Sequence, residues 1–337
     1  MIYEFALDPA LVARWSDPRE YRAYQGRFGV GTPRIPSRVP NKHWRRMVLE
    51  EFNALVSQLN PQEVAQRRLR LAEIVKPCLV GWAGRACTEH GTWLEMATRE
   101  HHRRAFQALL LSSQAGSAPK DVPTLRDPDF DPEDALWSPE QGLVPKTPRG
   151  FVGSLRPLLS FARTLHFIDP HFDPSKKRWQ EPLFALLEEA VRGRQPHEQP
   201  EVQLHTCVTR GRSGRGADGL TAIEKKTGAE KLLESFHRVK QSIPSKLRLA
   251  VFVWAERPAG REFHDRFLLT EFGGVQFGKG LDASQEGGRT ELITMLPRKA
   301  YSDLMTAFQP RSEAPWVRIV AASAAETEWG ERRWDHG

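Results

Sequence analysis

The residues best suited to chemistry lie within residues 261–282. His264 and Arg266 are separated by one residue, and the apolar run after them predicts that both belong to one strand. Alternate residues of a strand point to the same face, so an imidazole and a guanidinium would lie side by side. A turn expected at Gly273-Gly274 and a second short run at Val275-Gln276-Phe277 predict a β-hairpin.

A lysine flanked by glycines follows the hairpin, as Gly278, Lys279 and Gly280. Glycine allows backbone N–H groups to turn toward an anion, and lysine adds a cation. Together with the hairpin these groups could surround one phosphate. The alternative is structural, with the hairpin's imidazole paired to Asp265 or Glu271.

The elements that must position this hairpin alternate between strand and helix after Phe151. Strand patterns occupy residues 164–169, 202–209, 247–254 and 316–323, and helical patterns occupy residues 181–193, 229–241 and 298–309. This alternation predicts an α/β domain with a largely covered sheet over residues 151–320.

The first half of the chain has a different pattern. Residues 1–40 combine proline, arginine and aromatic residues without a clear period, which predicts an irregular arm. Apolar residues at helical spacing predict a helical region over residues 41–113, with helices at 43–59, 61–76 and 92–111. Prolines and acidic residues then predict a linker over residues 114–150, and residues 321–337 a loose tail.

Composition limits the possible classes of protein. The 337 residues are 39% hydrophobic, which suffices for a core, and no apolar run approaches the ~18 residues of a membrane span. Three scattered cysteines favour a reducing cytoplasm over a disulfide framework, and we expect no cofactor and no metal site. The net charge of +7 permits a nucleic acid or an anionic surface as partner.

The spacing of His264, Arg266 and Glu271 resembles the H-x-K-x4-D signature of the phospholipase D superfamily. It is most similar to the phospholipase-D-like domain that follows MIT domains, which has an HDR triplet, a glycine-rich turn and a final G-x-G-L-D. Asp169-Pro170-His171-Phe172 resembles the DPY-type motif of that subgroup. The resemblance covers roughly residues 151–310 and implies a phospholipase-D-like mixed sheet, here preceded by a helical region.

The resemblance also implies a chemistry. His264 would attack phosphorus and form a phosphohistidine, Arg266 would hold the phosphoryl oxygens, and Glu271 would orient the imidazole. Lys279 and the neighbouring N–H groups would form an anion site, and no metal would be needed. Asp169 would support the hairpin or cap a loop, while His171 would supply a second imidazole or serve as a packing residue.

Several positions depart from the hydrolytic pattern. Arg266 stands for its lysine, Glu271 for its aspartate, Lys279 for the downstream serine and Leu281 for the asparagine. The chain also has one credible motif, whereas a complete site contains two. Either two chains form a homodimer through residues 151–320, or the site is half-built and binds phosphate without turnover.

A basic, glycine-rich loop follows one of the expected strands. Arg210 and Arg212 lie in it and could reach phosphates at little steric cost, or the loop could simply be solvated. With the basic net charge, it favours nucleic acid as the ligand. We therefore expect recognition, with metal-independent cleavage as a further step, of nucleic-acid phosphodiesters, in a setting such as bacterial antiviral defence with protein partners.

A second function remains open from sequence alone. The chain could be an inactive binding and assembly module that docks on membrane lipid phosphates or on partner proteins. The absence of membrane features in the sequence makes the lipid surface the less favoured partner.

Overall fold

The computed structural model divides the chain into two compact units, residues 1–140 and 141–337. It describes residues 3–24, 27–40, 43–78, 90–126, 136–137, 142–194, 198–208, 222–256, 265–284, 287–308 and 316–323. The chain is a mixed α/β protein, as predicted, but each unit has its own sheet, whereas the sequence predicted a sheet only in the second. No described helix has the length and apolar character needed to cross a membrane.

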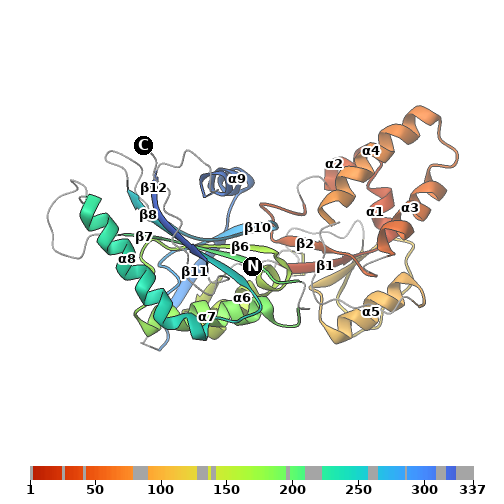
Figure 1. Cartoon of the computed structure of the whole chain (residues 1–337). Helices are drawn as coiled ribbons and strands as arrows, with labels where there is room; N and C mark the ends of the chain where they lie inside the picture. The colour runs from red at the N-terminus through yellow and green to blue at the C-terminus, as the bar shows by residue number, and fades with distance from the viewer. Residues whose placement is uncertain are drawn as a thin grey trace. The chain divides into compact units, whose positions relative to one another are not determined.

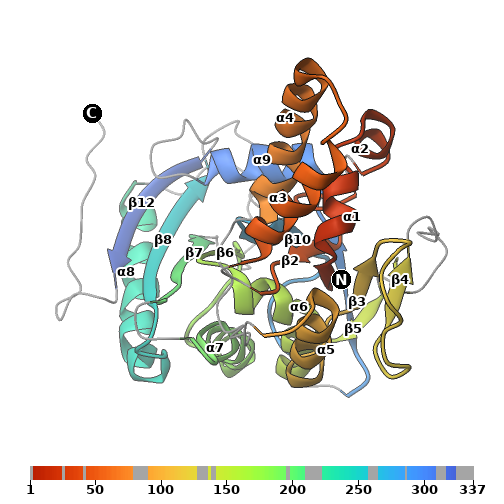
Figure 2. The same cartoon turned by 90° about the vertical axis from the view of Figure 1, so that its right-hand side faces the viewer.

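The first unit is built on a parallel sheet in the order β2-β1-β3-β4. Its strands are β1 (Tyr3–Leu7), β2 (Arg34–Ser37), β3 (Ala108–Leu111) and β4 (Thr124–Arg126). Its helices are α1 (Pro9–Arg14), α2 (Pro18–Tyr24), α3 (Trp44–Leu55), α4 (Pro61–Cys78) and α5 (Trp93–Arg103). Helix α5 lies on one side of this sheet and α1, α3 and α4 lie on the other (Figures 1 and 2).

The prediction of an irregular arm over residues 1–40 is wrong. Trp15 stacks on Tyr24 with ring centroids 4.2 Å apart, and Phe28 packs edge-on against Phe5 of β1. All four are buried in the core of the first unit. These aromatics follow no helical or strand period because they come from β1, the ends of two short helices and a loop, which converge on one cluster.

The predicted boundaries of the next two regions also need correction. The third helix ends at Arg103 rather than Leu111, and the apolar run Ala108–Leu111 forms the fully buried strand β3. The region 41–113 is therefore not wholly helical. Residues 114–150 are not a linker, since they contribute β4 to the first sheet and β5 (Leu143–Pro145) to the second.

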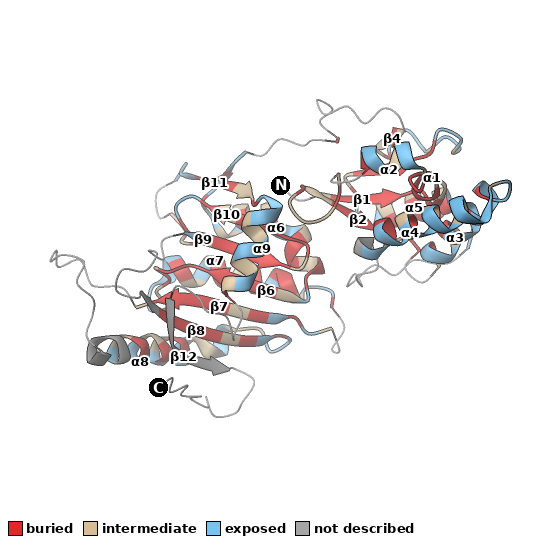
Figure 3. Cartoon of the chain, turned by 90° about the horizontal axis from the view of Figure 1, so that it is seen from above, coloured by how far each residue is buried: buried red, intermediate tan, exposed pale blue. Residues whose placement is uncertain are grey.

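The second unit contains an eight-stranded sheet in the order β12-β8-β7-β6-β9-β10-β11-β5. Its further strands are β6 (Thr164–Ile168), β7 (Glu201–Cys207), β8 (Arg248–Glu256), β9 (Arg266–Thr270), β10 (Gly273–Phe277), β11 (Thr290–Met295) and β12 (Trp316–Ser323). Strands β6, β7 and β8 are parallel, and β9 pairs antiparallel with β6 in the centre. The sheet is thus mixed, and its interior is buried (Figure 3).

Helices cover both faces of this sheet. Helices α6 (Pro148–Phe161), α7 (Lys177–Val191) and α8 (Ala222–Val239) lie on one face, and α9 (Arg298–Ala307) lies on the other (Figure 1). Helix α6, which the sequence pattern did not predict, is capped at its start, because Thr147 Oγ1 accepts a hydrogen bond from the Gly150 N–H at 3.1 Å. Pro148 occupies the first turn, where no intrahelical donor is lost.

The predicted hairpin is confirmed as β9 and β10, but its turn lies elsewhere. The strands pair from Arg266 opposite Phe277 to Thr270 opposite Gly273, and Glu271 and Phe272 form the turn. Gly273 begins β10 with φ of 143°, a conformation that favours glycine. The glycines therefore start the second strand instead of forming the turn.

Helix α6 provides a matched test of packing at the start of the second unit. A Cβ at Gly150 would lie 2.1 Å from the carbonyl oxygen of Pro145, whereas a Cβ at Gly153 meets nothing within 4 Å. We expect Gly150→Ala to lower the free energy of unfolding by about 2 kcal/mol or more, because backbone must move. Gly153→Ala should raise it by up to about 1 kcal/mol.

Urea denaturation of both variants measures this difference. Equal effects of the two substitutions would contradict the close approach of α6 to the end of β5.

Candidate functional site

The candidate site lies where β6 ends and β9 begins. Asp169 directly follows β6, and Arg266 is the first residue of β9, so the antiparallel pairing of these strands brings the two residues to the same edge of the sheet. Gly280 lies beside both. A Cβ on Gly280 would be 3.2 Å from Asp169 Oδ2 and 3.5 Å from Arg266 Nε. The structure thus gathers three residues that are far apart in the sequence.

Asp169 is fully buried and joins two of the predicted motifs. Its Oδ1 accepts the N–H of His171 at 2.9 Å, and its Oδ2 accepts the N–H of Leu281 at 3.1 Å. Burial raises the pKa of Asp169 to about 6, although these hydrogen bonds and the charge of Arg266 favour the ionised form. The carboxylate therefore fastens the 278–281 segment to the end of β6.

The backbone around Lys279 does not form the expected anion site. The Gly278 N–H donates to Leu292 O at 3.1 Å, and the Lys279 N–H donates to Glu291 Oε1 at 2.7 Å. With the Leu281 N–H held by Asp169, protein acceptors already use these donors. The carbonyl of Leu292 and the carboxylates of Glu291 and Asp169 therefore occupy donors that an external anion would need.

Glu271 lies at the other end of β9, which corrects its expected role beside His264. Its carboxylate accepts the N–H groups of Arg163 at 2.6 Å and Thr164 at 3.3 Å, where β6 starts. Burial raises the pKa of Glu271. Glu271 is five positions after Arg266, roughly 17 Å along the strand at the usual rise. Glu271 therefore anchors the start of β6.

The remaining predicted site residues have different outcomes. His171 lies at the edge of the sheet beside Asp169, through its backbone hydrogen bond. Arg266 Nε is buried and has no hydrogen-bond partner within the described part of the chain. His264, Arg210 and Arg212 lie outside the described residues.

A basic pocket of about 680 Å³ opens next to this strand edge. Its lining consists of Lys176, Lys177, Arg178, Asp282, Ala283, Ser284 and Arg289. The first three form the start of α7, and the others come from the chain between β10 and β11. The Ala283 N–H donates to the carbonyl of Arg178 at 2.7 Å, which joins the two walls.

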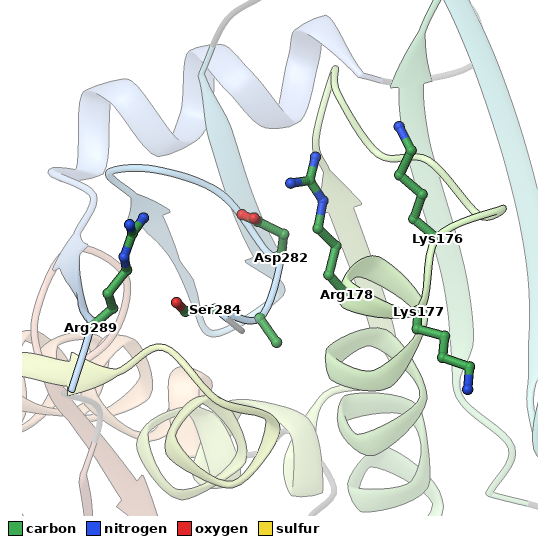
Figure 4. A pocket seen from close by; sticks show the side chains of 7 residues that line it. Lys176, Lys177, Arg178, Asp282, Ser284 and Arg289 are labelled. Carbon is green, nitrogen blue, oxygen red and sulfur yellow. The ribbon is translucent and has the colours of Figure 1, made fainter. Parts of the chain in front are cut away.

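The pocket carries an excess of positive charge. Four of the lining residues are cationic and one is acidic. Figure 4 shows Arg289 on one side and the α7 residues on the other, with Asp282 and Ser284 between them. Lys176, Arg178 and Arg289 extend in one direction in this view, and Lys177 extends in the opposite one.

The start of α7 adds to the attraction for anions. The N-cap, Lys176, makes no side-chain capping hydrogen bond. Uncapped N–H groups and the helix dipole favour negative charge at this end. The arrangement suits a phosphate or another anion with several oxygen atoms.

The α7 cations were missed from sequence because the helix was expected to begin at residue 181, and it begins at Lys177. Three consecutive basic residues after a strand-ending Asp-Pro sequence are the available signal. Such a run is usually read as a solvated surface, and only the actual helix start places it at the sheet edge.

No family model matches the sequence, and no curated protein matches it. Within the described residues no group of three or more histidine, cysteine, aspartate or glutamate side chains is placed to hold a metal ion.

The raised pKa of Asp169 predicts a specific pH dependence of stability. An unfolded chain ionises an aspartate near pH ~3.9. Between about pH 4 and pH 6 the unfolded state then binds fewer protons at this position than the folded state, so stability falls as pH rises. Relative to Asp169→Asn, the free energy of unfolding of the wild type should fall by on the order of 3 kcal/mol across this range.

Chemical denaturation of both proteins at a series of pH values measures the difference, in which other titrating groups cancel. A difference that stays constant with pH would contradict a buried carboxyl with a raised pKa.

Proposed function

We propose that this chain is a phospholipase-D-like protein that binds nucleic-acid phosphodiesters at the pocket beside Asp169 and Arg266. The observation that carries the proposal is the lining of the pocket, with four cations and one acid at the N-terminus of a helix. Phosphates are bound by such clusters because lysine and arginine attract their charge and helix N–H groups donate hydrogen bonds to their oxygens.

The dimensions and charge of the pocket support a polymer with several phosphates. Arg178 and Arg289 stand on opposite walls, with Lys176 beside the first (Figure 4). Separate cations along one pocket suit successive phosphates of a backbone, because each phosphate contact releases counterions and adds affinity. The net charge of +7 would attract the same ligand at long range.

The contact between two sequence motifs that resemble those of phospholipase-D-like domains also supports the proposal. Asp169 belongs to the DPHF sequence and Leu281 to the GKGLD sequence, and the two are joined by a hydrogen bond of 3.1 Å. Arg266 of the HDR triplet lies at the same edge, beside Gly280 and Asp169. A phospholipase-D-like arrangement would bring these motifs together around one phosphate.

The proposed function is binding of nucleic-acid phosphodiesters, and their hydrolysis would be a further step. His264 would be the nucleophile, but one motif supplies only half of a two-motif site. Arg266 and Lys279 also replace residues of the hydrolytic pattern. A homodimer through the second unit could complete the site, and that pairing, like a setting in bacterial genome defence, stays a prediction.

Replacement of the α7 cations tests the binding proposal. We expect Lys176→Gln/Arg178→Gln to weaken binding of a fluorescein-labelled DNA and to reduce the slope of log affinity against log salt by about 2, one unit for each lost phosphate contact. Fluorescence anisotropy at several NaCl concentrations gives both quantities.

A matched control lies at the start of α9. Arg298→Gln/Lys299→Gln removes the same charges from a helix N-terminus, and both Lys176 and Lys299 bond an aspartate at 2.8 Å. Because β11 runs antiparallel to β6, α9 starts at the opposite edge of the sheet. Equal losses in both double variants would show non-specific attraction only. Binding to anionic liposomes but not to DNA would favour the membrane-docking alternative.

The half-built site predicts binding without turnover. We expect labelled DNA to remain intact with the wild-type protein in EDTA and in magnesium, and His264→Ala to weaken binding. Gel analysis of the DNA detects cleavage. Cleavage that persists in EDTA and disappears in His264→Ala would show that the site also hydrolyses, whereas magnesium-dependent cleavage that survives His264→Ala would contradict the assigned chemistry.

A further inference from the structure

Asp282 is the one acid among the residues that line the basic pocket. A carboxylate in this position would repel a phosphate unless its charge were balanced nearby. A compensating positive charge, that of Lys146, lies behind the pocket wall. Lys146 Nζ lies 2.8 Å from Asp282 Oδ1, and the lysine side chain is 9% exposed.

Lys146 also pairs with a second acid, Glu291. Its Nζ is 3.4 Å from Glu291 Oε2, and the glutamate side chain is 1% exposed. The other oxygen of Glu291 accepts the Lys279 N–H at 2.7 Å. Glu291 is therefore held inside the protein, and Asp282 is the partner of Lys146 that a ligand in the pocket would meet.

The backbone of Lys146 secures the same wall. Its N–H donates to the carbonyl of Arg289 at 2.9 Å, and its own carbonyl accepts the Ser284 N–H at 2.9 Å. Arg289 and Ser284 both line the pocket. These two hydrogen bonds involve no side-chain atom of Lys146, so a substitution can remove the charge and retain the backbone connection.

We propose that Lys146 is a positioning residue that neutralises Asp282 and thereby sets the affinity of the pocket for phosphate polymers. The inference rests on the proposed function, since it concerns the same pocket. Lys146 does not line the pocket, and it acts through the carboxylate that does. The affinity of the site is then determined by one buried lysine as well as by the exposed cations.

A charge-compensation cycle tests the proposal with four proteins, namely the wild type, Lys146→Met, Asp282→Asn and the double variant. The probe is a fluorescein-labelled DNA duplex, measured by anisotropy at about 0.1 M and about 1 M NaCl, where the Debye length falls from roughly 10 Å to 3 Å. Circular dichroism establishes that each variant is folded.

We expect Lys146→Met to weaken binding about tenfold at the lower salt concentration, because the charge of Asp282 is then unbalanced. Asp282→Asn should tighten binding several-fold, and the double variant should return to within about twofold of the wild type. The differences should shrink at the higher salt concentration. A purely structural lysine would not be rescued by loss of its partner, and its effect would not depend on salt.

The exposed pair Lys299–Asp303 is the matched control, because its ionic contact is also 2.8 Å and it lies on α9. Lys299→Met and Lys299→Met/Asp303→Asn should bind DNA with the same affinity as each other, so removal of Asp303 should produce no rescue. Unchanged affinity in Lys146→Met, a double variant as weak as Lys146→Met, or losses equal at both salt concentrations would each overturn the proposal. If Lys146→Met does not fold, failure of Asp282→Asn to tighten binding overturns it.

Inorganic polyphosphate as a second probe separates this inference from the proposed function. If the wild type does not bind DNA, but the four proteins bind polyphosphate with the expected differences in affinity, the nucleic-acid proposal fails and the role of Lys146 stands. If DNA binds and all four proteins bind it with the same affinity, the role of Lys146 fails and the nucleic-acid proposal stands. Binding to neither probe overturns both.

Discussion

The candidate site depends on two buried carboxylates that hold the chain after β10. Glu291 accepts the N–H of Lys279 and Asp169 accepts the N–H of Leu281, two residues further along. Gly280, between them, has φ of 113° and lies against Asp169, where a side chain would be crowded. Removing Asp169 would leave the buried Leu281 N–H without its partner, which costs about 1–3 kcal/mol. These two contacts tie the segment that leads into the pocket wall to the sheet.

The same carboxylates create an electrostatic problem, since acids would lie behind a pocket for anions. The fold offsets it in two ways. Burial raises the pKa of Asp169 to about 6, and the charge of Arg266 lies close by. Lys146 is shared between Asp282 and Glu291. Internal acids can thus shape the loop while the outer cations determine what the pocket attracts.

Local signals predicted those parts of the fold that depend on short stretches of chain. Alternation of apolar residues identified the strands near residues 164–169 and 247–254, and the run after Arg266 identified the hairpin. The aromatics of residues 1–40 gave no period, because Trp15 and Phe28 reach one core from separate short elements. Helix α6 was missed, since its glycines and internal Pro157 obscure the helical pattern.

By itself the sequence determined the mixed α/β class, the hairpin with Arg266 at its start, and a basic chain suited to anions. Which residues share a site was decided only by the tertiary structure. Pairing of β6 with β9 brought Asp169 to Arg266 and placed Glu271 at the far end of the strand. The start of α7 and the position of Lys146 created the pocket and its charge balance. These contacts join segments roughly a hundred residues or more apart, and local periodicity carries no information about such distances.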